Sequence, residues 1–211
     1  MNLEQAQRLG EEIIEALTPA CERIAIAGSV RRGNPYPQGL EIVYVPGMKE
    51  QRVDLFTVAL QAATEDPIAD LVERRFWRYD NTMYPSDPRH KRLLRIVDLP
   101  ITERIHWPDP GQEEIAIDLF RAETGNWGYI YALHTGPEDF NQLWTSKQWH
   151  GGCCPADVTF QNGQVWQGGR HVPVREEEDL WQILKIPCWP PSERSATRLR
   201  QWMAGNKSIV D

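Results

Sequence analysis

Two short apolar segments in the first half of the chain each carry a single acidic residue, and this pattern strongly constrains the fold. Residues 40–45 hold Glu41, and residues 115–120 hold Asp118, among aliphatic and aromatic neighbours. Such runs are typical of strands. Carboxylates on neighbouring strands can converge on Mg²⁺, which prefers oxygen ligands. Each acid taken alone is more often ion-paired or placed at a strand end.

A glycine–serine turn precedes the first acidic segment. Residues 23–27 alternate like a strand and lead into Gly28 and Ser29, where we expect a short helix to begin. Glycine allows a phosphate to approach the backbone, and a helix start offers N–H groups and positive potential. Ser29 adds a hydroxyl, and Arg32 adds a planar cation suited to phosphate. The alternative is a surface turn followed by two solvated arginines.

The remaining pattern predicts a mixture of helices and strands. Helical spacing of apolar residues predicts helices at 3–17, 51–63, 66–75, 126–134, 137–148 and 176–183. We expect further strands within 74–100, with a loop at 84–88. Asn162 and Gly163 separate two short apolar runs, which is the signal of a β-hairpin. We therefore expect an α+β fold.

Composition favours a globular protein without a membrane partner. Hydrophobic residues make up 41% and charged residues 25% of the 211 residues. No apolar run approaches the roughly 20 residues that cross a bilayer. The acidic, amphipathic start of the chain is unlike a signal peptide, so we expect a cytoplasmic protein with its four cysteines reduced. The net charge of −7 lowers our expectation of tight, unaided DNA binding.

Several motifs, in order along nearly the whole chain, resemble those of the X-family (DNA polymerase beta-like) polymerases. Residues 28–33 match the family's Gly-Ser-x-Arg-Arg-Gly motif. The strand 39–43 lies where the family has a pair of acids, and residues 117–120 match the element with its third acid. Residues 135–141 resemble the thumb motif, and residues 176–181 and 190–194 resemble the family's last helix and its Pro-x-x-x-Arg tail.

The resemblance implies a fold and a reaction. Residues 1–122 would form the nucleotidyltransferase palm, a mixed β-sheet with helices, and residues 123–211 would form a small α/β thumb. The implied activity transfers a nucleoside monophosphate from a nucleoside triphosphate to a hydroxyl, here the 3′ end of gapped or primed DNA. Mg²⁺ is the implied cofactor, with Mn²⁺ as a substitute.

The resemblance also implies roles for individual residues. Glu41 and Asp118 would be the catalytic acids and the Mg²⁺ ligands, with Asp118 nearest the attacking 3′ hydroxyl. Ser29 and Arg32 would hold the β and γ phosphates, and Asn141 would flank the sugar and base. The full set of implied substrate-binding residues is Gly28, Ser29, Arg32, Thr135, Gly136 and Asn141.

One departure from the family pattern bears on catalysis. The first acid of the pair belongs at residue 39, which is glycine. In the family this carboxylate contacts both metal ions, and losing even an outer partner of a metal ligand typically costs about 10–100-fold. Ala116 and Thr145 replace basic residues that contact DNA. The alternatives are a non-catalytic relative that binds nucleotide or DNA, and a small-molecule nucleotidyltransferase on the same palm.

Overall fold

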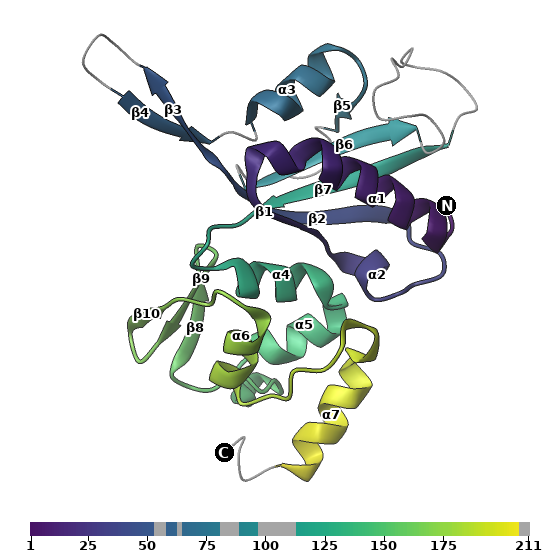
Figure 1. Cartoon of the computed structure of the whole chain (residues 1–211). Coiled ribbons are helices and arrows are strands. Elements are labelled where there is room, and N and C mark those ends of the chain that lie inside the picture. The colour runs from purple at the N-terminus through teal and green to yellow at the C-terminus, as the bar shows by residue number, and fades with distance from the viewer. Residues whose placement is uncertain (53–57, 63–64, 81–88, 97–112, 207–211) are drawn as a thin grey trace. The chain divides into compact units, whose positions relative to one another are not determined.

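The computed structural model describes residues 1–52, 58–62, 65–80, 89–96 and 113–206. The chain divides into two compact units (Figure 1). Unit 1 comprises Met1–Val30 and Asn34–Arg121, and unit 2 comprises Arg31–Gly33 and Ala122–Asp211. Each unit contains helices and strands, so the α+β expectation holds at this level. Among the described residues, no helix is long and apolar enough to cross a membrane.

Unit 1 is built on a mixed five-stranded sheet with the strand order β1-β2-β7-β6-β5. Only β2 and β7 run parallel to each other, and the other neighbours are antiparallel. The strands are β1 (Cys21–Ile26), β2 (Gly39–Pro46), β5 (Arg78–Tyr79), β6 (His90–Ile96) and β7 (Glu114–Arg121). The helices are α1 (Leu3–Leu17), α2 (Gly28–Arg31) and α3 (Glu65–Glu73). The helix expected at 3–17 is therefore confirmed, and α3 corresponds to the one expected at 66–75.

Strand alternation separates the core of unit 1 from its polar face. Alternate residues of β2 and β7 belong to the same buried cluster as residues of α1, which lies along the sheet in Figure 1. The cluster includes Leu9, Ile13, Leu17, Leu40, Ile42, Tyr44, Ile115, Ile117 and Leu119. Burying each large apolar side chain contributes about 1.5–3 kcal/mol. Because side chains alternate along a strand, Glu41 and Asp118 point to the face opposite this cluster.

The prediction of a helix at 51–63 is wrong. Its described residues belong to the strands β3 (Met48–Arg52) and β4 (Val58–Ala62), which pair antiparallel with Met48 opposite Ala62. Short apolar runs fit a strand or a buried helix equally well by periodicity alone, and here cross-strand pairing decides between them. The strands expected within 74–100 are present as β5 and β6, whereas the loop expected at 84–88 lies outside the described residues.

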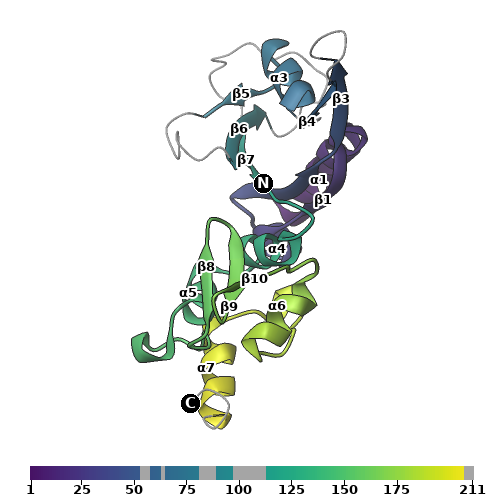
Figure 2. The ribbon, with the colours of Figure 1, turned by 90° about the vertical axis from the view of Figure 1, so that its left-hand side faces the viewer.

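Unit 2 combines four helices with a three-stranded antiparallel sheet in the order β10-β9-β8, among its described residues. Figure 2 shows these strands beside α5 and α6. The helices are α4 (Trp127–Thr135), α5 (Glu138–Thr145), α6 (Glu177–Leu184) and α7 (Ala196–Gly205). The strands are β8 (Val158–Gln161), β9 (Gln164–Gln167) and β10 (Arg170–Val172). Asn162 and Gly163 have φ angles of 52° and 74°, as a tight hairpin turn requires.

Aromatic side chains fill the core of unit 2. Trp144 is fully buried and meets Trp181 edge to face, with ring centroids 5.7 Å apart. Phe160 of β8 stacks on Tyr129 at 5.1 Å and meets Trp144 at 5.5 Å. Such pairs contribute about 0.5–1.5 kcal/mol beyond the area they bury. This packing joins α4, α5 and α6 to the small sheet.

Candidate functional site

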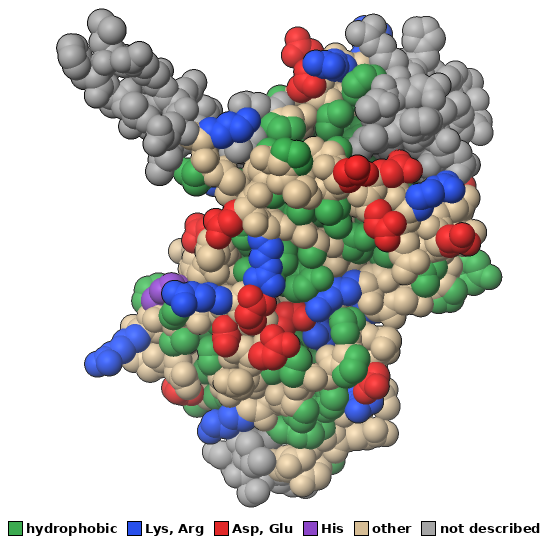
Figure 3. Space-filling view, viewed as in Figure 1, with side chains coloured by type: hydrophobic (Ala, Val, Ile, Leu, Met, Phe, Trp, Pro, Cys, Tyr) green, Lys and Arg blue, Asp and Glu red, His purple; other side chains and the backbone are tan. Residues whose placement is uncertain are grey.

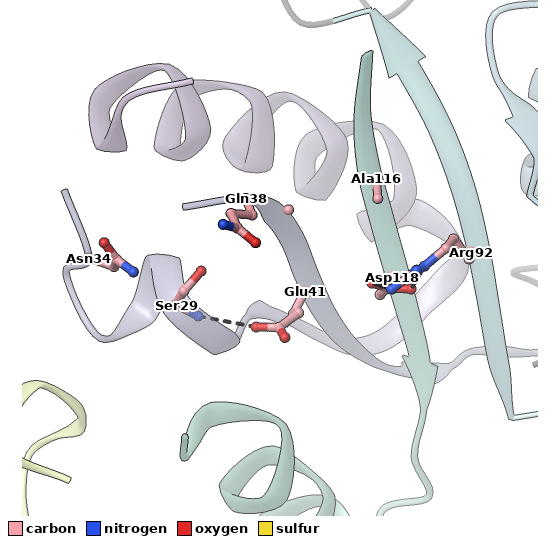
Figure 4. A pocket seen from close by; sticks show the side chains of 8 residues that line it. Ser29, Asn34, Gln38, Glu41, Arg92, Ala116 and Asp118 are labelled. Carbon is pink, nitrogen blue, oxygen red and sulfur yellow. Dashed lines mark hydrogen bonds and ion pairs between the residues drawn. The ribbon is translucent and has the colours of Figure 1, made fainter. Parts of the chain in front are cut away.

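A cavity of about 430 Å³ opens on the polar face of the unit 1 sheet. Figure 4 shows its lining side chains, which come from α2, from β2, β6 and β7, and from the segment between α2 and β2. The lining residues are Ser29, Asn34, Gln38, Gly39, Glu41, Arg92, Ala116 and Asp118. Six of the eight carry polar or charged side chains. The cavity therefore suits a polar ligand.

Glu41 and Asp118 stand side by side in this cavity. They are paired in the parallel β2–β7 ladder, and Gly39 pairs with Ala116 two residues earlier. Neighbouring strands lie about 4.7–4.9 Å apart, and paired residues of a ladder project to the same face. The structure thus brings together the two acids that the sequence singled out, with Ser29 lining the same cavity.

The carboxylate of Glu41 lies against the start of the short helix α2. The backbone N–H of Ser29 donates to Oε2 of Glu41, with a donor–acceptor distance of 3.1 Å. Gly28 has a φ of +60°, and a Cβ placed there would lie 1.1 Å from the same Oε2. Glycine is required at position 28 for both reasons. The anion held at this turn is the chain's own Glu41.

Asp118 is held by two basic side chains of β6. Nε of Arg92 lies 2.7 Å from Oδ1, Nη2 of Arg92 lies 2.7 Å from Oδ2, and Nε2 of His90 lies 2.7 Å from Oδ1. The β6–β7 register places Arg92 directly opposite Asp118 and His90 opposite Phe120, on which its ring stacks at 4.6 Å. The sheet therefore positions both partners of the carboxylate.

These contacts keep the carboxylate of Asp118 ionised, although Asp118 is only 6% exposed to solvent. Burial alone would raise its pKa, but the hydrogen bonds from His90 and Arg92, together with the positive charges of these side chains, outweigh that effect. The net result is a pKa below the ordinary value of an aspartate. Asp118 is consequently a carboxylate, rather than a carboxylic acid, at neutral pH.

The donor set fits one Mg²⁺ ion shared with a substrate. Mg²⁺ is commonly bound by one or two carboxylates together with phosphate oxygens and water. Glu41 and Asp118 supply two carboxylates of the required kind. Within the described part of the chain, no group of three or more histidine, cysteine, aspartate or glutamate side chains could hold a metal ion. Phosphate oxygens and water would have to complete the coordination of such an ion.

Gly39 leaves room for a side chain at the position where the X-family pattern, which the sequence resembles, has an acid. Its φ is outside the left-handed range, so its backbone does not require glycine. Among the described residues, a Cβ at this position would meet the backbone oxygen of Ala116 at 3.2 Å and Cβ of Ala116 at 4.0 Å. A side chain there therefore needs a shift of a few tenths of an ångström. It would project on the same face as Glu41, two residues along β2.

The two arginines of the Gly-Ser motif, Arg31 and Arg32, belong to unit 2. Nη1 of Arg32 donates to the backbone oxygen of Thr135 at 2.6 Å. Nη1 of Arg31 donates to the hydroxyl of Thr135 at 2.8 Å, and Nη2 of Arg31 lies 2.6 Å from Oε2 of Glu177. Glu177 also pairs with Arg194 at 2.7 Å. These bonds join the 31–33 segment to α4 and α6.

Asn141 stabilises the turn between α4 and α5. Its side-chain amide donates to the backbone oxygens of Leu133 and Gly136 at 2.6 and 3.0 Å. Its oxygen accepts a hydrogen bond from Nε1 of Trp144 at 3.0 Å. A Cβ on Gly136 would lie 2.2 Å from that oxygen, so the turn needs glycine there. Of the implied substrate-binding residues, Thr135, Gly136 and Asn141 therefore form one connected structure with Arg32.

The sequence did not reveal the partners of Asp118. Residues 89–92 form a basic run, and by sequence alone such a run fits either contact with nucleic-acid phosphate or a solvated face. The side chains of His90 and Arg92 instead contact Asp118. Their spacing of two residues, which places them on one face of a strand, was the available signal.

No protein-family model and no curated protein matches the chain.

Proposed function

We propose that the chain is a DNA polymerase beta-like nucleotidyltransferase. It would transfer a nucleoside monophosphate from a Mg²⁺-bound triphosphate to the 3′ hydroxyl of DNA. The observation that carries the proposal is the pairing of Glu41 with Asp118 on parallel strands, in a cavity that Ser29 also lines. In this proposal, unit 1 is the palm and unit 2 is the thumb.

The side chains of the cavity suit the proposed transfer. The 3′ hydroxyl would give up its proton to water, its oxygen would form a bond to the α phosphorus, and the bond from that phosphorus to pyrophosphate would break. Asp118 is ionised and therefore able to orient the attacking hydroxyl as a hydrogen-bond acceptor. Ser29 offers a hydroxyl to a phosphate oxygen. Bound Mg²⁺, held by Glu41 and Asp118, would neutralise charge on the phosphates.

DNA is the proposed acceptor, and the charge of the chain predicts that it binds weakly. The net charge is −7, and Figure 3 shows acidic and basic side chains interspersed on one face. Affinity for duplex DNA depends strongly on Lys and Arg neutralising phosphates. We therefore expect transfer to require a high concentration of DNA.

A second candidate function is nucleotide or DNA binding without catalysis. Two observations favour it. Gly39 supplies no carboxylate, and both oxygens of Asp118 are already bound by Arg92, with His90 sharing one of them. A metal ion at Asp118 has to compete with these partners. The two candidates share a binding site and differ only in whether transfer occurs.

Primer extension separates the two candidates. We expect the parent chain to add nucleotides slowly to gapped DNA in Mg²⁺ or Mn²⁺, and Asp118→Asn to abolish the addition. Glu114→Gln is the matched control, because Glu114 lies on the same strand but is exposed and paired with Arg78. It should leave the rate unchanged. Triphosphate binding by the parent without addition, at any metal concentration, would establish the non-catalytic candidate instead.

A further inference from the structure

Arg92 is hydrogen-bonded to both oxygens of Asp118, the carboxylate that would bind a metal ion in the proposed function. Its Nε and Nη2 each lie 2.7 Å from a different oxygen of Asp118. Such side-on, charge-assisted pairs are among the strongest hydrogen bonds in proteins. Figure 4 shows the guanidinium group against Asp118 at one side of the cavity. A metal ion and this guanidinium therefore compete for the same two oxygens.

The position of Arg92 is a property of the fold. Arg92 and Asp118 are paired in the antiparallel β6–β7 ladder, so their side chains leave the sheet from adjacent points on one face. The side chain of Arg92 is 21% exposed and that of Asp118 is 9% exposed. Ion pairs shielded from water in this way are weakened less by solvent than surface pairs. The contact is therefore a persistent competitor.

We propose that Arg92 is a built-in competitor for divalent cations, and that it sets the metal affinity of the Glu41–Asp118 site. Metal binds both carboxylates only when the guanidinium leaves Asp118. The inference rests on the proposed function to the extent that Glu41 and Asp118 are the metal ligands. Arg92 acts through Asp118 and is in this sense a positioning residue.

The charges in the cavity give a physical reason for a cationic side chain beside Asp118. Two carboxylates of adjacent strands face the same space, and like charges placed together destabilise a folded state. Arg92 offsets one of these charges in the absence of any metal. Removing Arg92 should therefore leave the two carboxylates less compensated, with His90 still bonded to Asp118, and this pair should bind a divalent cation more readily.

Binding of Mn²⁺ alone to the full chain tests the inference without any catalytic readout. Isothermal titration without nucleotide should give an affinity about 10–100-fold higher for Arg92→Gln than for the parent, the factor expected when a charge-assisted hydrogen bond no longer competes. The matched control is Arg78→Gln, because Arg78 pairs with the exposed Glu114, which lies on β7 like Asp118. Its affinity should equal that of the parent. Adding Asp118→Asn to Arg92→Gln should abolish the gain.

Two further measurements make the outcome decisive. If Arg92→Gln does not fold, Arg92→Lys replaces the two-point contact by a point charge and should show a smaller gain of the same sign. Mn²⁺ should also raise the melting temperature of the Arg92 variant more than that of the parent, because a ligand stabilises the state that binds it. An unchanged or weaker Mn²⁺ affinity in a folded Arg92 variant overturns the inference.

This test distinguishes failure of the inference from failure of the proposed function. A gain in Mn²⁺ affinity without nucleotide transfer by any variant supports the competition and contradicts the transferase proposal. Transfer that requires Asp118 but is accompanied by no gain in Mn²⁺ affinity on loss of Arg92 supports the transferase and contradicts the competition. The metal titration and primer extension therefore report on separate claims.

Discussion

Arg92 and Asp118 face each other across the β6–β7 ladder, with two of the guanidinium nitrogens each 2.7 Å from one carboxylate oxygen. This relationship links stability to function, because the acid that the proposed reaction requires is also a structural partner of β6. The same contact holds Asp118 ionised and, in the proposed competition, opposes metal binding. Changes at either residue should consequently alter both stability and ligand binding.

Asp118→Asn should destabilise unit 1. The substitution leaves the shape of the side chain but removes the charge that pairs with Arg92 and His90. We expect a loss of about 1–3 kcal/mol in the free energy of unfolding, measured in urea. Glu114→Gln breaks an exposed pair with Arg78 and should cost less than about 1 kcal/mol. Equal losses for the two variants would contradict the assigned importance of the buried pair.

Gly28→Ala should destabilise the chain more than Gly33→Ala does. Both glycines have positive φ angles, +60° and +75°, so alanine is strained at each position by roughly 1 kcal/mol. At Gly28 the added Cβ also collides with Glu41, whereas at Gly33 no atom of the described part of the chain lies within 4 Å of it. Urea unfolding of the two variants measures the difference. A loss at Gly33 as large as that at Gly28 would show that backbone strain alone is responsible.

Stability should fall in acid, and Glu177 should account for part of the decrease. Burial raises the pKa of Glu177, but hydrogen bonds from Arg31 and Arg194 and their charges outweigh it, so the folded-state pKa is lowered. A depressed pKa contributes stability above the unfolded value, near 4.5, and loses it as the pH falls through the folded value. Unfolding measured from pH 7 to pH 3 should show this decrease. Glu177→Gln should be less stable at pH 7 and show a shallower decrease.

The four cysteines should differ in their reactivity towards alkylating agents. Burial raises the pKa of Cys21 to about 11 and, with the nearby Cys154, that of Cys153 to about 12. Thiolates are the reactive form, so these residues should be modified slowly at neutral pH. Cys188 is exposed, and iodoacetamide labelling followed by peptide mass spectrometry should find it modified first. Labelling of Cys153 before Cys188 would contradict the described burial.

The sequence predicted those parts of the fold that local patterns determine. Leu9 and Ile13 lie at helical spacing in α1, and Asn162-Gly163 favours one hairpin, so neither element depends on distant residues. The sequence-based prediction failed at Met48–Arg52 and Val58–Ala62, which form strands stabilised by pairing with each other. Local periodicity contains no information about such a partner.

The candidate site was also predictable only in part. Glu41 and Asp118 were identifiable because an acid stands out in an apolar strand, and the β2–β7 register then places them together. The contact of Arg92 with Asp118 was not predictable, because it depends on the register between β6 and β7. A shift of that register by one residue would place Arg92 on the opposite face of the sheet.

The central claim is that Glu41 and Asp118 belong to a nucleotidyltransferase site that lacks one acid, and Gly39→Asp tests it most directly. The rate of primer extension by this variant should exceed that of the parent by at least about 10-fold, because a missing metal ligand is restored. Gly39→Asn is the matched control of equal size and should give no such gain, and Gly39→Asp combined with Asp118→Asn should be inactive. A folded Gly39→Asp variant that extends primers no faster than Gly39→Asn would contradict the claim.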